Sequence, residues 1–568
     1  MGGGVGFKKL RIVHLNDVYT LEHLPRVKSL VASFQDDSMT LVSCGGDFLA
    51  PYVLSTLDHG AGMVEVLNAI PTTHAILGNH ECDVPHEALL DRIDEFRGKW
   101  LNSNFRALGS SMPEYDIVEI NGARIGIVGV LCDYPQLYRA SSFNGLVDQI
   151  RDPVAVATEL ASELKSRENC DAIIALTHLD FPDDQRLAQG GQVALILGGH
   201  DHQILNTKEG DVRILKAGMN AEQVAIVEWT CGPGLVLEEK SARIVEVKAY
   251  PEDAETRRLV DAHMLKVRAL DKMVLTTVNE LKSELFATTS RLSLPLTSAE
   301  SRLGECSVAT MLCSVLKWEL DVDCCILEAG SVRGNQTYDA AFTFAHLKQE
   351  MPFLNATGIA AIDGTTFAKM IRESRAKPGP NFLHVDADCI VVDGNVRKVD
   401  GSEIKPSKVY SVAVGVDLGF GSSVNQTMIQ YAKDQPTRIP SLESAIPAKT
   451  VILTFFAQRF WRRLPAFDEL CEEDAITFDD LHDAFVHAFM THESQEDVDA
   501  AKQMVKQLIV SFDKDNDGKI SRLEYEAIFS RHARRRNYAK CAVRRNSCST
   551  FYLRRDASLI HDDGDTTP

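Results

Sequence analysis

Five short apolar segments in the first half of the chain each end in an acid, an amide or an imidazole. The segments are residues 10–15, 40–44, 73–77, 171–176 and 193–197, and the groups that follow them are Asn16-Asp17, Gly45-Gly46-Asp47, Gly78-Asn79-His80, Thr177-His178 and Gly198-Gly199-His200-Asp201-His202. Short apolar runs that end in glycine turns are typical of buried strands. Because an open α/β sheet builds its site along its strand ends, this order predicts an α/β domain with a functional site there.

Three side chains that can serve a metal site lie within five residues at the end of the third segment. Asn79 offers a carbonyl oxygen to a metal, and His80 can donate a proton or a hydrogen bond. Asp83, three residues further on, can hold the imidazole ring. A polar strand-to-helix loop would give the same pattern for this segment alone. The four other strand endings favour the functional interpretation.

The ligand types indicate which metals the site takes. Mixtures of Asp, Asn and His without a thiolate suit divalent Mn, Zn, Fe or Co. A carboxylate shared by two ions, for which Asp47 is the best candidate, would hold them about 4 Å apart, as in two-metal phosphoryl chemistry. The sequence therefore predicts two divalent ions that activate water against a phosphate ester.

In this order, the five blocks resemble the calcineurin-like metallophosphoesterases, and with the second half of the chain they resemble the 5′-nucleotidase branch, over roughly residues 8 to 435. The resemblance implies an α/β fold with a four-layer metallophosphoesterase sandwich and a 5′-nucleotidase C-terminal α/β domain. It implies a catalytic dyad of His80 and Asp83. It also implies one metal held by Asp17, Asp47 and His202, and a second metal held by Asp47, Asn79, His178 and His200.

Tyr19 departs from the family pattern, which usually has histidine at this position. A tyrosine can bind trivalent iron as a phenolate, or it can leave the first metal one ligand short. An Asn-Asp-Val-Tyr block resembles a branch that contains mannosylglucosyl-3-phosphoglycerate phosphatases. The substrate is therefore expected to be either a 5′-nucleotide or a sugar phosphoglycerate.

The middle of the chain has the pattern of a connector followed by a second α/β domain. Residues 255–281 predict a charged connector helix, and residues 298–316 predict another helix. Arg333 follows a predicted strand in a glycine-rich loop, which resembles the Gly-Gly-Gly-Ile-Arg loop of the 5′-nucleotidase C-terminal domain and implies that it grips substrate. Phe382 is a candidate for stacking on a nucleoside base, although a core aromatic would fit the same pattern.

Residues 513–524 fit the calcium-binding loop of an EF-hand throughout. Gly518 allows the turn, and calcium oxygens are predicted from Asp513, Asp515, Asp517, Lys519 (backbone), Ser521 (through water) and Glu524. Residues 469–480 have the frame of a partner loop, but Asp474 stands where glycine is required and Asp480 where glutamate is best. The sequence thus predicts a small all-α EF-hand pair with one intact and one degenerate loop.

Composition narrows the remaining choices. The formal net charge of −20 argues against a general nucleic-acid binder, and no apolar run reaches the length of a membrane span. Thirteen cysteines without a paired framework are expected to be reduced thiols in a cytoplasmic protein. Residues 531–555 carry nine basic residues and no acidic one, which suits either a solvated tail or docking to an acidic partner or a membrane surface.

These observations predict a cytoplasmic metal-dependent phosphomonoesterase that acts on a small phosphorylated substrate. An alternative from another class is a calcium-sensing scaffold with an impaired phosphatase domain, for which Tyr19 is the motivation. The expected parts of the chain are a catalytic domain (1–250), a helical connector (251–285), a substrate domain (286–450), the EF-hand pair (455–535) and a basic tail (536–568).

Overall fold

The computed structural model describes residues 9–526 except for gaps at 110, 135–136, 139–140, 232–236, 271–272, 282–294, 377–378, 393–394, 399–401, 417–424, 443, 461–463, 471–474, 490–501, 503–504, 506–512 and 514–516. The chain divides into two compact units, residues 1–457 with 489–500 and residues 458–488 with 501–568. Every cysteine in the described part is a free thiol. No helix among the described residues is long and apolar enough to cross a membrane. Asp515 and the basic tail lie outside the described residues.

The N-terminal part of the first unit is built on two six-stranded sheets. The first sheet has the order β12-β11-β1-β2-β3-β4, and the second has the order β5-β6-β7-β8-β10-β9. Their bounds are β1 Lys9–Leu15, β2 Ser38–Cys44, β3 His74–Ile76, β4 Lys99–Leu101, β5 Tyr115–Ile120, β6 Ala123–Leu131, β7 Ala172–His178, β8 Leu195–Gly198, β9 Ile204–Glu209, β10 Val212–Ala217, β11 Gln223–Cys231 and β12 Leu237–Glu246. We call this part the N-terminal sandwich.

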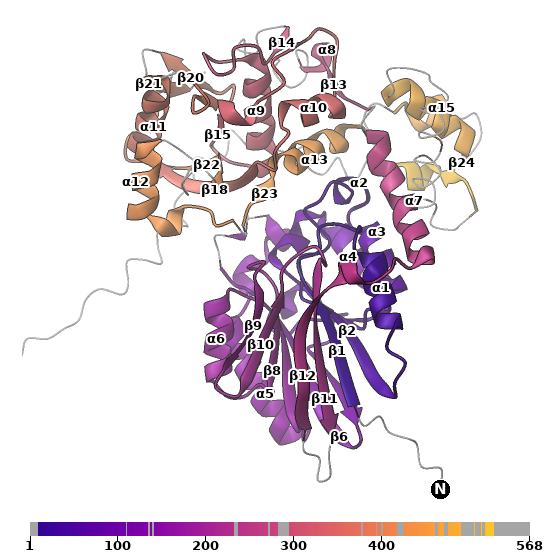
Figure 1. Ribbon diagram of the computed structural model, residues 1–568. Coiled ribbons are helices and arrows are strands. Elements are labelled where there is room, and N and C mark those ends of the chain that lie inside the picture. The colour runs from indigo at the N-terminus through magenta and orange to yellow at the C-terminus, as the bar shows by residue number, and fades with distance from the viewer. Residues whose placement is uncertain are drawn as a thin grey trace, which may run out of the picture. The chain divides into compact units, whose positions relative to one another are not determined.

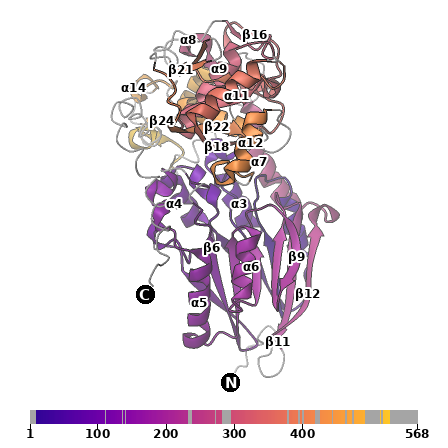
Figure 2. The same cartoon turned by 90° about the vertical axis from the view of Figure 1, so that its left-hand side faces the viewer.

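The two sheets pack face to face. Alternate side chains along each strand point to opposite faces of its sheet, so one set meets the other sheet and the other set meets the helices. Leu10 and Ile12 of β1 share one apolar cluster with Ile174 and Leu176 of β7. Residues of the other parity, such as Val13, pack with the helices in a second cluster. Helices cover both outer faces (Figures 1 and 2). They are α1 Leu24–Ala32, α2 Ser55–Asp58, α3 Ala61–Ala69, α4 His86–Glu95, α5 Pro153–Arg167, α6 Phe181–Gln189 and α7 Ala254–Leu270.

The five strands singled out from the sequence form, but they do not belong to one sheet. Strands β1, β2 and β3 run parallel in the first sheet, whereas β7 and β8 run parallel in the second. The four-layer α/β arrangement that the resemblance implies is thus observed, with the five strands divided between its two sheets. Strand periodicity cannot reveal this division, because both sheets offer the same apolar faces to the core.

Two helix predictions also differ from the structure. The connector helix ends at Leu270 rather than residue 281, and Val274–Thr277 forms β13, which pairs with β17 Ala341–Thr343. The β-branched residues of that segment favour a strand once a partner strand is present. The helix expected from residue 298 begins only at Ser307, because Glu300 adopts a positive φ of 63° that a right-handed helix excludes.

The rest of the first unit centres on a five-stranded sheet of order β19-β15-β22-β18-β23. Its strands are β15 Cys324–Glu328, β18 Ala356–Asp363, β19 Leu383–Val385, β22 Val409–Gly415 and β23 Ile446–Pro447. The main helices are α9 Ser307–Leu320, α10 Phe344–Glu350, α11 Gly364–Ala376, α12 Gln426–Asp434 and α13 Ala448–Phe460. The remaining short elements are α8 Val278–Glu280, β14 Leu296–Thr297, β16 Thr337–Tyr338, β20 Cys389–Val392 and β21 Asn395–Lys398. We call this part the central sheet region.

The described residues of the second unit contain short helices and one small β ladder. The elements are α14 Phe467–Leu470, β24 Ala475–Ile476, α15 Phe478–Phe489 and β25 Ile520–Ser521, followed by helical residues 522–526. Strand β24 pairs with β25 in antiparallel fashion. The ring of Tyr525 contacts that of Phe467, and its hydroxyl donates to the carbonyl of Pro465.

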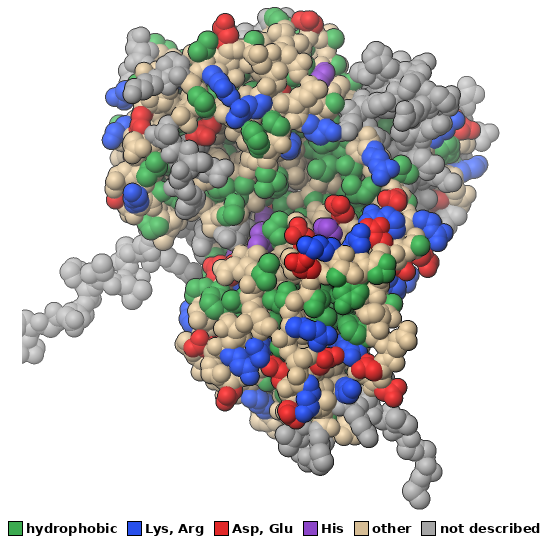
Figure 3. Space-filling view, in the orientation of Figure 1, with side chains coloured by type: hydrophobic (Ala, Val, Ile, Leu, Met, Phe, Trp, Pro, Cys, Tyr) green, Lys and Arg blue, Asp and Glu red, His purple; other side chains and the backbone are tan. Residues whose placement is uncertain are grey.

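Acidic and basic side chains are interspersed over the face of the first unit seen in Figure 3. Ion pairs also connect strands of the N-terminal sandwich. Arg11 of β1 lies 2.8 Å from Glu228 of β11 and 2.7 Å from Asp36, so these opposite charges compensate one another.

Candidate metal centre

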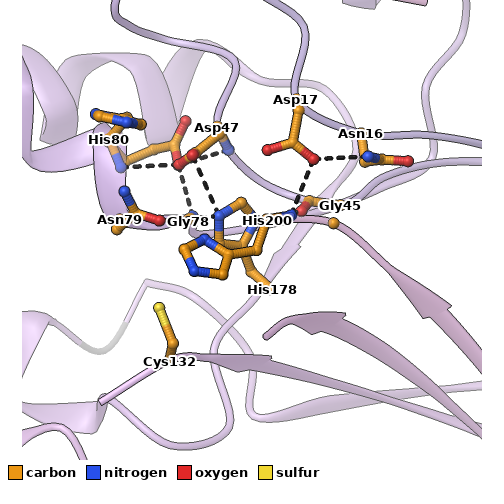
Figure 4. Close-up of polar contacts among 12 residues, drawn as sticks. Asn16, Asp17, Gly45, Asp47, Gly78, Asn79, His80, Cys132, His178 and His200 are labelled. Carbon is orange, nitrogen blue, oxygen red and sulfur yellow. Dashed lines mark hydrogen bonds and ion pairs between the residues drawn. The ribbon is translucent and has the colours of Figure 1, made fainter. Parts of the chain in front are cut away.

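The carboxyl ends of the five singled-out strands meet at one place in the N-terminal sandwich. Asp17 follows β1, Asp47 follows β2, Asn79 follows β3, His178 closes β7 and His200 follows β8. Figure 4 shows these side chains converging from separate loops, with His80 at the edge of the group. The sandwich brings both sheets' strand ends together, so ligands far apart in the sequence become neighbours.

One cluster in this centre contains Asp47, His178 and His200. One ligand atom from each lies within 4.8 Å of the other two, and all three residues are buried. His178 Nε2 lies 3.2 Å from Asp47 Oδ2 and 3.1 Å from the side-chain oxygen of Asn79. The structure therefore gathers all four residues expected at the second metal.

A neighbouring cluster contains Asp17, Tyr19 and His202. His202 Nε2 lies 3.5 Å from Asp17 Oδ1 and 3.1 Å from the Tyr19 hydroxyl. The same hydroxyl donates to Asp47 Oδ2 over 3.2 Å. Burial, followed by the Asp47 and Asp17 carboxylates, raises the pKa of Tyr19 well above its usual value. Tyr19 thus connects the residues of the two expected metal positions through its hydroxyl.

The backbone is strained where these residues sit. Asp17, Asp47, His200 and His202 have φ values of 54°, 54°, 84° and 53°. Such left-handed conformations are uncommon for residues with a side chain and persist only where the surroundings impose them. Gly46 allows the turn before Asp47, with a φ of 85°, and an added Cβ there would lie 2.6 Å from His178 Nδ1.

The charges of the centre and one unpaired buried nitrogen fit divalent metals. His200 Nδ1 is buried without a hydrogen-bond partner among the described residues, as expected of a nitrogen that awaits another ligand. Burial and the nearby His178 lower the pKa of His200 far below its usual value, which keeps the ring in its neutral, metal-binding form. Burial alone would raise the pKa of Asp47, but His178 and His80 lower it, so this carboxylate is ionised.

His80 and Asp83 form a hydrogen-bonded pair beside the metal cluster. They lie three residues apart in a 3₁₀ turn, Asn79–Asp83, which places them on one face. His80 Nδ1 donates to Asp83 Oδ2 over 2.7 Å, and the His80 backbone N–H donates to Asp47. Burial lowers the pKa of His80, but the Asp47 and Asp83 carboxylates outweigh it and raise the pKa to about 9. The arrangement holds the ring in one orientation.

Glu81 is a supporting residue that the sequence analysis did not identify. Its buried carboxylate accepts backbone N–H groups from Asp47, Phe48, Leu49 and Gly78, at 2.9, 2.8, 3.1 and 2.5 Å. Burial and Asp47 raise the pKa of Glu81 to about 7, although these N–H groups favour the ionised form. Glu81 ties the loop after β2 to the loop after β3. Its position beside His80 in the sequence was the available signal.

Lys216 supports the other side of the centre. This buried lysine of β10 lies 2.9 Å from Asp184 and 3.0 Å from Asp201, and its Nζ donates to the carbonyls of Leu179 and Gly199. The four partners flank His178 and His200 in the sequence. A lysine inside the apolar segment 212–217 was a sequence signal for a buried ion pair.

Arg333 lies in the central sheet region, in the loop after β15. Its side chain is exposed, its guanidinium carbon lies 5.1 Å from the centre of the Phe353 ring, and its Nε donates to the carbonyl of Gly330. Buried Glu350 holds this loop by accepting the Gly334 N–H over 3.0 Å. Ser298 and Tyr338 donate hydroxyls to the same carboxylate. The loop is thus fixed from beneath while the arginine stays accessible.

Phe382 does not have the exposure that base stacking requires. Only 3% of the residue is exposed, its ring meets the His384 ring edge-on, and the Arg375 guanidinium lies 4.7 Å from its centre. The expectation that Phe382 stacks on a nucleoside base is therefore wrong for this conformation. The His384 ring and the Arg375 guanidinium occupy positions beside the ring.

Comparison with known proteins identifies the two halves of the first unit. Residues 10–204 match the family of calcineurin-like phosphoesterases, and residues 285–416 match the 5′-nucleotidase C-terminal domain. The chain carries a calcineurin-like phosphoesterase domain. All the candidate metal and dyad residues of that domain lie within the matched range.

Individual relatives of the phosphoesterase domain agree with this assignment. An uncharacterized metallophosphoesterase, YunD of Bacillus subtilis, is 26% identical over 295 residues, which are 49% of this chain and 62% of YunD. The 5′-nucleotidase of Vibrio cholerae is 27% identical over 224 residues, 34% of this chain and 40% of that protein. The chain thus spans less than two thirds of these relatives. The solved NAD nucleotidase of Haemophilus influenzae has a TM-score of 0.61 at 17% identity, covering 78% of this chain and 95% of that one, and so shares its fold.

Proposed function

We propose that this chain is a metal-dependent phosphomonoesterase whose substrate is a small nucleotide-like phosphate ester. The observation that carries the proposal is the buried convergence of Asp47, His178 and His200, with Asn79 and Asp17 beside them. A donor set of carboxylate, amide and imidazole groups suits two divalent ions. The phosphoesterase match and the 5′-nucleotidase relatives support the same reaction class.

The residues divide the work as follows. Asp17, Asp47 and His202 would hold one ion, and Asp47, Asn79, His178 and His200 would hold the other. Two ions held there lower the pKa of a bound water and stabilise charge on phosphate oxygens. His80, oriented by Asp83, donates a hydrogen bond or a proton to the phosphate or to the leaving oxygen. Arg333, on its fixed loop, pairs with a negative group of the substrate.

The test is phosphate release by the full chain with Mn, Zn, Co and Mg. The panel contains AMP, UMP, p-nitrophenyl phosphate and a 3-phosphoglycerate sugar conjugate. We expect release from the nucleotides, and a loss of about 100-fold or more in His80→Asn. His23→Asn, at the start of α1, is the matched control and should retain activity. Faster release from the sugar conjugate than from the nucleotides would mean that the substrate is a sugar phosphoglycerate. No release with any metal would favour a scaffold role.

We further propose that the second unit is a pair of EF-hands in which the intact loop binds calcium. Within residues 513–524, Gly518 has the required positive φ of 82°, and Asp513 accepts the backbone N–H groups of Asp517 and Gly518 at 3.1 and 2.7 Å. These bonds place the turn at Asp517 and Gly518 against the first carboxylate of the loop. Calcium oxygens would come from this loop in the pattern expected of an EF-hand.

The pairing of the two loops supports this proposal. Ile476 pairs with Ile520, and each is the eighth residue of its twelve-residue frame, 469–480 or 513–524. The ninth residue caps the following helix in both frames. Thr477 N donates to Asp480 over 2.9 Å, and Ser521 N donates to Glu524 over 2.8 Å. The two loops are thus related as pseudo-equivalent partners, although only the second has a glycine at its sixth position.

Calcium binding is tested by titration calorimetry of the full chain in the presence of excess magnesium. Wild type should bind calcium at the second loop. Glu524→Gln removes one charge from the bidentate position and should weaken binding at least about 10-fold. Glu526→Gln, two residues further on and outside the loop, is the control. Equal affinities for wild type and Glu524→Gln would refute the assignment.

A further inference from the structure

A second cluster of metal-binding side chains lies in the core of the central sheet region. Cys324 begins β15, Asp386 lies in the turn after β19, and Cys389 begins β20. Cys389 Sγ lies 3.8 Å from Cys324 Sγ and 3.7 Å from Asp386 Oδ2, and one ligand atom from each residue lies within 4.8 Å of the others. All three residues are buried. Nothing in the phosphoesterase mechanism uses them.

The two separations from Cys389 Sγ are close to the edges of a tetrahedral zinc complex, and the third lies within 4.8 Å. A zinc–sulfur bond of about 2.3 Å places two cysteine sulfurs about 3.8 Å apart, and a zinc–oxygen bond of about 2.0 Å places sulfur and oxygen about 3.5 Å apart. The observed distances of 3.8 and 3.7 Å therefore need little movement to accept an ion. Two sulfur ligands select thiophilic ions such as zinc over magnesium or calcium.

The surroundings of Asp386 resemble the support that metal-binding carboxylates receive. Its Oδ1 accepts from Lys317 Nζ at 3.1 Å and from the Asp388 N–H at 3.1 Å, while its Oδ2 accepts from the Cys325 N–H at 2.9 Å and faces Cys389. Such hydrogen bonds orient a carboxylate ligand. Two thiolates and one carboxylate around a divalent ion leave one negative charge, and the Lys317 ammonium, which also pairs with Asp388, lies beside it.

We propose that Cys324, Asp386 and Cys389 form a structural site for a thiophilic divalent ion of the zinc class. Binding replaces the two S–H bonds by two sulfur–metal bonds and releases both protons to solvent. The ion would join the start of β15 to the turn between β19 and β20, which are 60 or more residues apart in the chain. The opposite end of β15 leads into the loop of Arg333, so the ion would stabilise the sheet that carries this loop.

Cobalt substitution of the full chain tests the proposal. Thiolate-bound cobalt gives an intense near-ultraviolet charge-transfer band, and the candidate ligands of the phosphoesterase centre among the described residues include no cysteine. We expect this band in wild type and its loss in Cys324→Ser and in Cys389→Ser. Cys313→Ser, which removes another buried thiol on α9, is the matched control and should keep the band.

A second measurement needs no variant. X-ray absorption of the zinc-loaded wild type should contain a sulfur shell at about 2.3 Å, which the histidine and carboxylate ligands of the phosphoesterase centre cannot give. Absence of both the sulfur shell and the cobalt band would overturn the proposal. So would a protein mass lower by two hydrogens under non-reducing conditions, traced by peptide mapping to a Cys324–Cys389 disulfide.

Discussion

The Tyr19 hydroxyl donates to Asp47 Oδ2 over 3.2 Å and lies 3.1 Å from His202 Nε2. Tyr19 therefore bridges the residues of the two metal positions, where the related phosphoesterases usually have a histidine. Hydrogen bonds of this kind orient metal ligands and affect affinity through them. With tyrosine in place of histidine, the position loses an imidazole, which is a strong neutral metal ligand. It gains a hydroxyl, which is more effective as a hydrogen-bond donor.

We predict that Tyr19→Phe weakens metal binding or turnover by about 10-fold, because Asp47 and His202 lose a shared partner. Tyr19→His should tighten binding of one ion, because it adds an imidazole ligand. Metal stoichiometry and affinity, measured by competition with a chromophoric chelator, check both outcomes. Complete loss of one ion in Tyr19→Phe would instead show that the tyrosine itself is a ligand.

A second prediction concerns Glu81, which accepts four backbone N–H groups from the loops after β2 and β3. Glu81→Gln places an amide N–H₂ against N–H donors, so at least one buried donor loses its acceptor. We expect a loss of about 1–3 kcal/mol in the free energy of unfolding and a fall in turnover, because Asp47 shifts. Urea unfolding and steady-state kinetics measure the two effects.

The control for that variant is Glu159→Gln, which removes an exposed ion pair with Arg151. Such a pair contributes about 0–1 kcal/mol, so stability and turnover should stay near the wild-type values. Equal behaviour of the two variants would show that Glu81 does not hold the loops together.

The order of the five strand endings was sufficient to predict that the side chains after these strands converge at one place. Each ligand follows directly from an apolar strand, and parallel strands bring their carboxyl ends to one edge. The division into two sheets was not predictable in this way, because it depends on which strands pair across long distances. His178 is an example of a contact between the two sheets. It closes β7 of the second sheet, and its Nδ1 donates to the carbonyl of Gly45, which follows β2 of the first sheet.

Predictions failed where tertiary contacts decide the outcome. Val274 to Thr277 continued a helical pattern in the sequence, yet they form a strand because β17 offers a partner. Phe382 stands in a family-like block, but its burial excludes the role that the block suggests. Lys216 was missed because its function depends on Asp184 and Asp201, which reach it only in the folded chain.

Lys216 gives a third prediction. Lys216→Met leaves the two carboxylates of Asp184 and Asp201 buried without their cation, and breaking such a buried pair costs about 3–5 kcal/mol. We expect a large fall in the urea midpoint and weaker metal binding, because the loop of His200 loses its anchor. Lys208→Met is the control, at an exposed position 3.9 Å from Glu239. It should change neither the free energy of unfolding nor that of metal binding by more than about 1 kcal/mol.

The last prediction concerns pH. Burial lowers the pKa of His384 to about 4, and its Nε2 donates to the carbonyl of Ser301 over 2.9 Å. In the unfolded chain the pKa of the same ring is about 6.5. Between these two values the unfolded state binds more protons than the folded state, so acidification through this window destabilises the central sheet region, and raising the pH above it restores stability.

His384→Gln keeps a donor for Ser301 but cannot titrate. Its stability should therefore fall less than that of wild type between pH 7 and pH 5. Hydrogen-exchange protection of the β15 and β19 peptides, corrected for intrinsic exchange, measures this locally. His23→Gln, in the N-terminal sandwich, is the control and should follow wild type. A steep pH dependence that persists in His384→Gln would mean that another group governs the acid sensitivity of this sheet.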